Sequence, residues 1–203
     1  MRATEILREE HLVIQQVLNC LEEMSDRACI NGELDGSAAR DMVDFFRHFA
    51  DGCHHSKEEA CLFPLMEARG FDRDRGPTGV MLAEHEQGRA CLKAMEADID
   101  AAAAGDRNAV ARFADAAAAY TQLLHEHIFK ENQRLFPMAD QVFSEADQRM
   151  LLDRFVHVER HDMGQGTHER YLKLADNLAE RFNVKRETSD DVQPHTCCGH
   201  VHA

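Results

Sequence analysis

The most informative stretch of the chain is HIFKENQRLFP at residues 127–137, and a similar stretch, HHSKEEACLFP, occupies residues 54–64. The two share His, Lys, Glu, Leu, Phe and Pro at the same relative positions. In each, a histidine stands four residues before a glutamate: His54 before Glu58, and His127 before Glu131. Residues at this spacing lie on one face of an α-helix, with about 5–6 Å between their Cβ atoms. Each pair can therefore bind one metal ion or two neighbouring ions.

A further histidine precedes each pair at almost the same distance. His11 lies 43 residues before His54, and His85 lies 42 residues before His127. The chain thus contains one arrangement twice, each copy a helical hairpin with one ligand on its first helix and two on its second. Two such hairpins predict a four-helix bundle with the ligands on facing helices.

This pattern resembles the hemerythrin-like family over about residues 1–140, including the Leu-Phe-Pro that follows each glutamate. The resemblance implies an all-α fold, an up-down four-helix bundle that holds two non-haem iron ions joined by an oxo or hydroxo bridge. Manganese or zinc could occupy the same site, because imidazole and carboxylate also suit these metals. The ligands that it implies are His11, His54, Glu58, His85, His127 and Glu131.

Apolar periodicity and turn residues predict the helices and their ends. Ser37 and Thr167 are expected to cap helices, and Pro64 is expected to kink the second helix or end it near Phe63. Glycines at 164 and 166 interrupt the fifth helix. The expected ranges are 4–28, 37–68, 78–104 and 107–139 for the bundle, 144–182 for the additional helix of a domain spanning residues 1–182, and 183–203 for a flexible tail.

The chain departs from the oxygen-carrying hemerythrins, which have a second histidine four residues from the one on the third helix. Here the two such positions hold Met81 and Arg89, so one iron is expected to lack a histidine. The last carboxylate is also a glutamate, where the carriers have an aspartate one residue later. Both departures favour the bacterial hemerythrin-like proteins associated with peroxide, nitric oxide or iron handling.

The fifth helix is a potential source of the missing ligand. Glu159 and His168 are the leading candidates there, either as a ligand or as groups behind the ligands. His55 and His125 are expected at the surface or behind the ligands, because an α-helix turns them about 100° and 200° away from the neighbouring motif histidines. The flanking acids Glu10, Glu59, Glu84 and Glu86 are expected to be solvated or to lie behind the ligands.

Three functions suit such a centre. The first is an enzyme that decomposes hydrogen peroxide or reacts with nitric oxide; the second is a protein that binds or senses oxygen; the third delivers iron or repairs iron–sulfur centres. The adjacent Cys197 and Cys198 are reminiscent of repair proteins of this superfamily. The expected ligand is a small molecule (O₂, H₂O₂ or NO), and both the oligomeric state and enzymatic turnover stay open.

Charge and hydropathy limit the partners. The formal net charge of −14 repels phosphate backbones and anionic lipids, so neither nucleic acid nor a membrane is an expected partner. There is no apolar run of about 18 residues and no apolar leader. We therefore expect a cytoplasmic protein whose seven cysteines are largely free thiols.

The tail contains five side chains that can bind soft or borderline metals, and we predict a weak metal site there. Truncation after Phe182 should leave the metal content of the bundle unchanged and abolish a weaker binding event, because ordering a tail costs conformational entropy. Metal titration of the full and truncated chains measures both. Identical titrations would show that the tail has no metal role. The side chains concerned are His195, Cys197, Cys198, His200 and His202.

Overall fold

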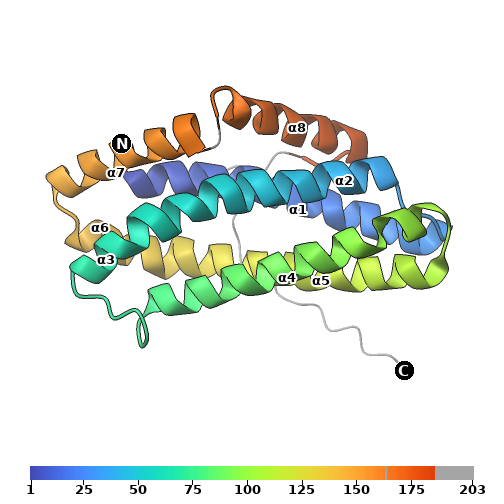
Figure 1. The fold of residues 1–203 in the computed structure, drawn as a ribbon, viewed down its shortest axis with the longest axis horizontal. Helices are drawn as coiled ribbons and strands as arrows, with labels where there is room; N and C mark the ends of the chain where they lie inside the picture. Colours follow the sequence, from blue (N-terminus) through green and yellow to red (C-terminus); the bar gives the residue numbers. More distant parts are fainter. Residues whose placement is uncertain (163, 186–203) are drawn as a thin grey trace.

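The computed structural model describes residues 1–162 and 164–185, and the described part is all-α, as predicted. Four helical runs lie side by side, and a fifth run is laid along one side of them (Figure 1). None of the described helices is both long enough and apolar enough to cross a membrane. The tail side chains from His195 to His202 lie outside the described residues.

The runs agree with the predicted ranges, but several contain π-helical segments, labelled η. The first run is α1 (Ala3–Asn31), and the third is α4 (Pro77–Ala103). The others are composite. The second comprises α2 (Gly36–Phe45), η1 (Phe46–His55), η2 (Glu58–Leu62) and α3 (Phe63–Ala68); the fourth comprises α5 (Arg107–Lys130), η3 (Glu131–Leu135) and α6 (Phe136–Val142); and the fifth comprises α7 (Glu145–His157), η4 (Val158–Asp162) and α8 (Thr167–Phe182).

Two of the predicted helix caps are wrong. Asp35 caps α2 by accepting a hydrogen bond from the Ala38 amide at 3.2 Å, so Ser37 lies inside the helix. Thr167 is the first residue of α8, and Gly166 precedes it as the cap with a φ of 82°. Ser144 Oγ accepts from the amide of Asp147, whose carboxylate accepts from the Ser144 amide at 2.9 Å.

Pro64 does not end the second helical run, and the proline of the second motif has the same effect on its own helix. A proline lacks an amide hydrogen, and its ring clashes with the carbonyl four residues earlier. In both copies of the motif the preceding turn is π-helical: the amide of Phe63 bonds Glu58 O, and that of Phe136 bonds Glu131 O, each five residues back. The wider turn accommodates the proline. It begins at the motif glutamate, so the Phe-Pro pair shapes the backbone that presents this side chain.

The interruption of the fifth helix is confirmed. Gly164 and Gly166 have φ angles of 90° and 82°, a left-handed conformation that side chains disfavour. The halves on either side, α7 and α8, lie end to end along the bundle (Figure 1). On α8, Tyr171 donates a hydrogen bond to Asp44 Oδ2 at 2.9 Å. The carbonyl of Ala175 accepts one from Gln16 of α1 at 3.1 Å, so the fifth run is joined to both α1 and α2.

A layer of polar residues divides the apolar interior into two clusters. On α1, Leu7 belongs to one cluster and Ile14 to the other, with His11 between them. The other runs repeat this order with His54, His85 and Glu131. A buried polar group costs free energy unless it is paired, so this layer needs partners inside the bundle. The predicted metal ligands are those residues.

Candidate metal centre

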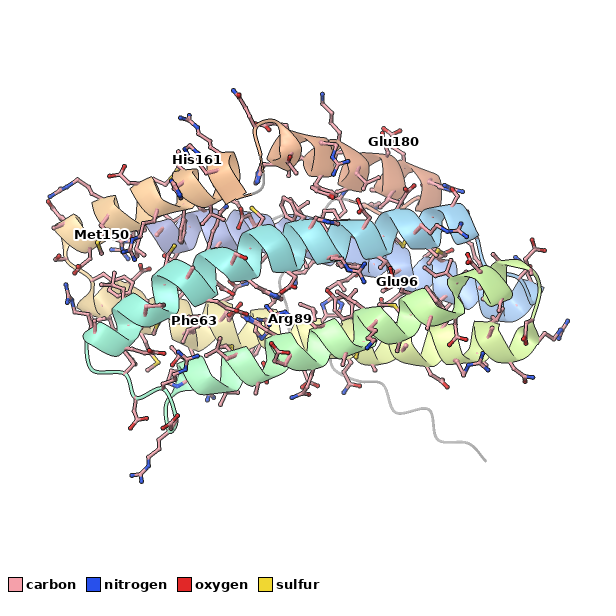
Figure 2. All side chains as sticks on the ribbon, viewed as in Figure 1. Phe63, Arg89, Glu96, Met150, His161 and Glu180 are labelled. Atoms are coloured by element: carbon pink, nitrogen blue, oxygen red, sulfur yellow. The ribbon has the colours of Figure 1, made fainter. Side chains whose placement is uncertain are left out.

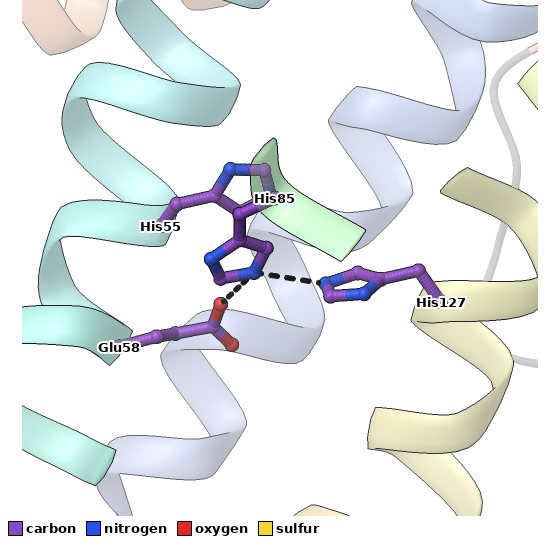
Figure 3. Close-up of side chains that lie close together, drawn as sticks. All are labelled: His55, Glu58, His85 and His127. Atoms are coloured by element: carbon purple, nitrogen blue, oxygen red, sulfur yellow. Dashed lines mark hydrogen bonds and ion pairs between the residues drawn. The ribbon is translucent and has the colours of Figure 1, made fainter. Parts of the chain in front are cut away.

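Seven buried side chains converge in the polar layer. All are at most 4% exposed, and they form two groups that share Glu58. Within each group, one ligand atom per residue lies within 4.8 Å of all the others. All six predicted ligands are present, together with His55. The first group is His11, His54, Glu58 and Glu131; the second, drawn in Figure 3, is His55, Glu58, His85 and His127.

The two glutamates extend between the groups. Glu131 places Oε2 3.1 Å from His11 Nε2 and Oε1 3.3 Å from His127 Nε2. Glu58 places Oε1 3.7 Å from His54 Nε2 and Oε2 3.5 Å from His85 Nε2, the latter drawn in Figure 3. Each carboxylate therefore points one oxygen toward each group, so both glutamates could take part in holding two ions.

The histidine rings are fixed from outside by their Nδ1 atoms. His54 Nδ1 lies 3.0 Å from Glu10 Oε2, and His127 Nδ1 lies 2.9 Å from Glu84 Oε2. An ionised carboxylate only accepts hydrogen bonds, so Nδ1 donates and Nε2 carries a lone pair toward the centre. This is the common arrangement of metal-binding histidines. The remaining pairs are His85 with Glu59 at 2.7 Å, His55 with Asp51 at 3.3 Å, and His11 with the Asn132 side-chain oxygen at 3.0 Å.

Several inward-facing atoms make no hydrogen bond among the described residues. Nε2 of His11 and of His54, and both carboxylate oxygens of Glu58 and Glu131, are buried without a hydrogen bond. His85 Nε2 faces His127 Nε2 at 3.2 Å, where the outer hydrogen bonds give both atoms lone pairs. A cation between these atoms removes both the repulsion and the unpaired oxygens. The donor set therefore fits a metal centre, and the chemistry of its atoms suits iron.

The protonation states agree with this fit. Burial, together with neighbouring histidines, lowers the pKa of His54 and His55 well below the usual value, so both rings are neutral and able to bind metal. Burial and the adjacent Glu131 raise the pKa of Glu58 well above its usual value. Without a positive ion, the two glutamates share this site at high electrostatic cost. Metal binding would offset that cost.

His55 differs from the sequence expectation. It is 4% exposed, and its ring stacks on that of His85 with centroids 3.8 Å apart and an interplanar angle of 12°. The expected outward orientation assumed the regular α-helical turn. In the π-helical η1, hydrogen bonds run to the fifth residue, as from the Ser56 amide to Asp51 O. The wider turn lets the adjacent His54 and His55 both face the centre.

Arg89 and Met81, the positions where a second third-helix histidine was sought, have structural roles. Met81 lies in the apolar cluster beyond the centre. Arg89 reaches across the bundle from α4 (Figure 2), and its Nη2 bonds Asp51 at 2.7 Å and Glu59 at 2.8 Å. These carboxylates hold His55 and His85, so Arg89 supports two rings of one group. In the sequence, the position of Arg89 one helical turn after His85 was the signal that could have indicated this role.

Among the described residues, the fifth run contributes no side chain to either group, and His55 supplies the additional histidine that was expected from that run. Glu159 Oε1 lies 2.6 Å from Lys57 Nζ, and His168 Nδ1 lies 3.9 Å from Cys53 Sγ. Both residues therefore lie behind the ligands, which was the second of the two positions expected for them. The other polar candidates have different positions. Three of the flanking acids accept hydrogen bonds from histidine rings of the centre: Glu10, Glu59 and Glu84. Glu86 pairs with Arg89 at the surface, and His125 lines an external groove between α1 and α5.

Comparison with known proteins agrees with this architecture. The family model of the hemerythrin HHE cation-binding domain matches residues 2–139, which include all seven central side chains. The chain belongs to this family. It is 28% identical over 178 residues to the uncharacterized proteins Mb2018 of Mycobacterium bovis and Rv1995 of Mycobacterium tuberculosis, covering 88% of this chain and 68% of each relative. No solved structure gave a significant match. The fifth run lies beyond the matched HHE domain.

Replacing His55 tests its assignment to the centre. His55→Ala should lower the bound metal by about one ion per chain, or weaken one ion about 10–100-fold, because one group loses a donor. The matched control is His48→Ala in the same π-helical segment, whose side chain is 51% exposed. Metal analysis after gel filtration measures both variants. Equal metal content in the two variants would contradict the assignment.

Removal of the metal should destabilise the fold, and the metal-free protein should lose further stability in acid. Bound metal stabilises only the folded state, so a chelator should lower the unfolding temperature. The folded-state pKa values of His54 and His55 lie below the unfolded value of 6.5, so the unfolded chain binds more protons as the pH falls below 6.5. These two histidines therefore lose their contribution to stability as the pH falls below 6.5, while the raised pKa of Glu58 acts in the opposite direction. With two groups against one, the stability of the metal-free protein should fall from pH 6.5 to 5. Thermal melts from pH 8 to 5 check this, and a flat profile would contradict it.

Proposed function

We propose that the chain is a non-haem di-iron protein that reacts with small oxygen or nitrogen species, with hydrogen peroxide as the first candidate substrate and nitric oxide as the second. The observation that carries the proposal is the set of inward-facing histidine and glutamate atoms without partners. Their number and overlap suit two ions, and membership of the HHE family makes iron the first choice. Manganese and zinc stay alternatives for the same donors.

The two metal positions would have unequal donor sets. Glu58 belongs to both groups, and Glu131 belongs to the group of His11 and His54 and reaches toward His127; three histidines (55, 85 and 127) belong to one group and two (11 and 54) to the other. Fewer imidazoles at one position would make that position the more open to an external molecule. We therefore place the reacting small molecule beside His11 and His54.

The surroundings of this position are apolar on one side. Phe136 stacks on His11, with ring centroids 5.4 Å apart and an interplanar angle of 10°. Phe63 stacks on His85 in the second group at 5.9 Å. Both phenylalanines come from the repeated Leu-Phe-Pro, and all four Leu and Phe side chains are buried. These rings limit water at the centre, which suits a small uncharged molecule.

Reactivity, rather than oxygen storage, is favoured by the carboxylates behind the rings. A carboxylate that accepts from Nδ1 makes the imidazole a more basic ligand, which favours the higher oxidation state of a metal. Four of the five histidines have such a carboxylate. Because His55 belongs to the second group, neither iron would lack a histidine there. Two neighbouring irons would supply the paired electron changes by which two peroxide molecules give two of water and one of dioxygen.

The proposal predicts iron binding and peroxide consumption by one preparation. Full-length protein loaded anaerobically with ferrous iron should retain about two ions per chain and, in air, develop a charge-transfer absorption band. Added peroxide should release one dioxygen per two peroxides consumed, recorded with an oxygen electrode. Glu131→Ala should lose both iron and activity, whereas His48→Ala should keep both.

Other outcomes separate the alternatives. Slow peroxide consumption with rapid loss of nitric oxide would select the second candidate substrate. A reduced protein that binds dioxygen and releases it intact under vacuum would identify an oxygen-binding protein and contradict our proposal. Protein that retains no iron, manganese or zinc would contradict the metal centre itself.

A further inference from the structure

The internal repeat extends beyond the metal ligands to a second set of charged residues. In the first half, Glu10 accepts from His54 Nδ1 through one oxygen and from the Lys57 ammonium through the other. In the second half, Glu84 joins His127 and Lys130 in the same way. Each lysine stands three residues after its histidine. Each half thus contains a chain of contacts from a cation, through a carboxylate, to a ring that faces the centre.

The two chains of contacts end in different environments. The Lys130 side chain is 36% exposed, whereas that of Lys57 is completely buried. Lys57 has a second carboxylate partner, Glu159, whose Oε1 lies 2.6 Å from Nζ, and its ammonium lies 5.7 Å from the centre of the Phe155 ring. Phe155 and Glu159 come from α7 and η4. Of the two lysines, Lys57 of the first half is therefore the one that contacts the run beyond the HHE domain.

The group around Lys57 does not need a further metal ion. Glu10, Cys53, Glu159 and His168 place one ligand atom each within 4.8 Å of one another. The Lys57 ammonium already bonds both carboxylates of this group. A buried ammonium between two carboxylates satisfies the charge that a metal would otherwise balance. The group is better explained as a support for the centre than as a second centre.

We propose that Lys57 and Glu159 are a positioning pair through which the fifth run sets the donor strength of His54, and so the properties of one metal ion but not the other. This inference rests on the di-iron proposal above. Glu159 shares the ammonium with Glu10 and limits the pull of Lys57 on that carboxylate. Loss of the Glu159 charge strengthens the bond between Lys57 and Glu10. Glu10 then accepts less strongly from His54, which becomes a weaker metal ligand.

The test is replacement of Glu159 in the full-length, iron-loaded protein. Glu159→Gln keeps the shape of a side chain that is 31% exposed, so the fold should survive. Competition with a ferrous chelator should show about 10-fold weaker retention of one iron and unchanged retention of the other. Mössbauer spectra of ⁵⁷Fe-loaded protein should show the signal of one iron shifted and that of the other in place. If the glutamine variant fails to fold, Glu159→Ala, which leaves no competing polar group, carries the test.

Two controls make the result specific. Lys130→Met changes the equivalent cation of the other half and should affect the second iron signal, not the first. Glu169→Gln alters an exposed residue of the cavity beside Glu159 and should change neither. A merely structural role of Glu159 would weaken both irons together, and that result overturns the inference. If the wild-type protein binds two irons and Glu159→Gln changes the signal of neither, this inference is overturned and the di-iron proposal stands. Wild-type protein that binds no iron overturns the di-iron proposal and this inference with it.

Discussion

The structure depends on a layer of buried atoms that repel one another. Five imidazoles turn lone pairs inward, and two carboxylates stand among them without hydrogen bonds. Apolar packing on both sides cannot supply the positive charge that this layer requires. The two apolar clusters stabilise the ends of the bundle, and their free energy offsets the cost of the layer in the metal-free protein. A bound metal would therefore contribute to the stability of the fold as well as to its chemistry.

The outer contacts explain how so many donors stay in position. Each ring is held at Nδ1, and the carboxylates that hold four of them are themselves bonded to cations. Arg89 serves two carboxylates, while Lys57 and Lys130 serve one in each half. Such ordered outer contacts reduce the reorganisation needed when a metal binds. They also assign a structural role to several of the acidic residues that, by composition alone, indicate only a negatively charged surface.

The sequence was sufficient for the bundle and for six of the seven central side chains, because helical spacing and an internal repeat both survive in the fold. It was not sufficient for His55. Predicting its direction required knowing that η1 is π-helical, and the α-helical angle of 100° per residue fails there. The contacts of Glu159 were equally inaccessible, since they depend on how the fifth run packs against the bundle. Two helix caps were predicted wrongly because the capping residues, Asp35 and Gly166, lie close in sequence to the expected Ser37 and Thr167. Backbone geometry determines which of these neighbouring residues caps the helix.

The two halves of the repeat differ in the ligands that they contribute, and the difference lies at one position of the motif. The first copy of the motif begins His54-His55, and the second begins His127-Ile128. Both second residues are buried, but Ile128 packs in the larger apolar cluster, whereas His55 joins the group of His85 and His127. One copy therefore contributes a donor to the ligand group of the other copy. A symmetric repeat would give two equivalent groups, whereas this exchange gives one group three histidines and leaves the other with two histidines and a second glutamate. The first half also carries the buried Lys57, so the group with two histidines is the one connected to the fifth run.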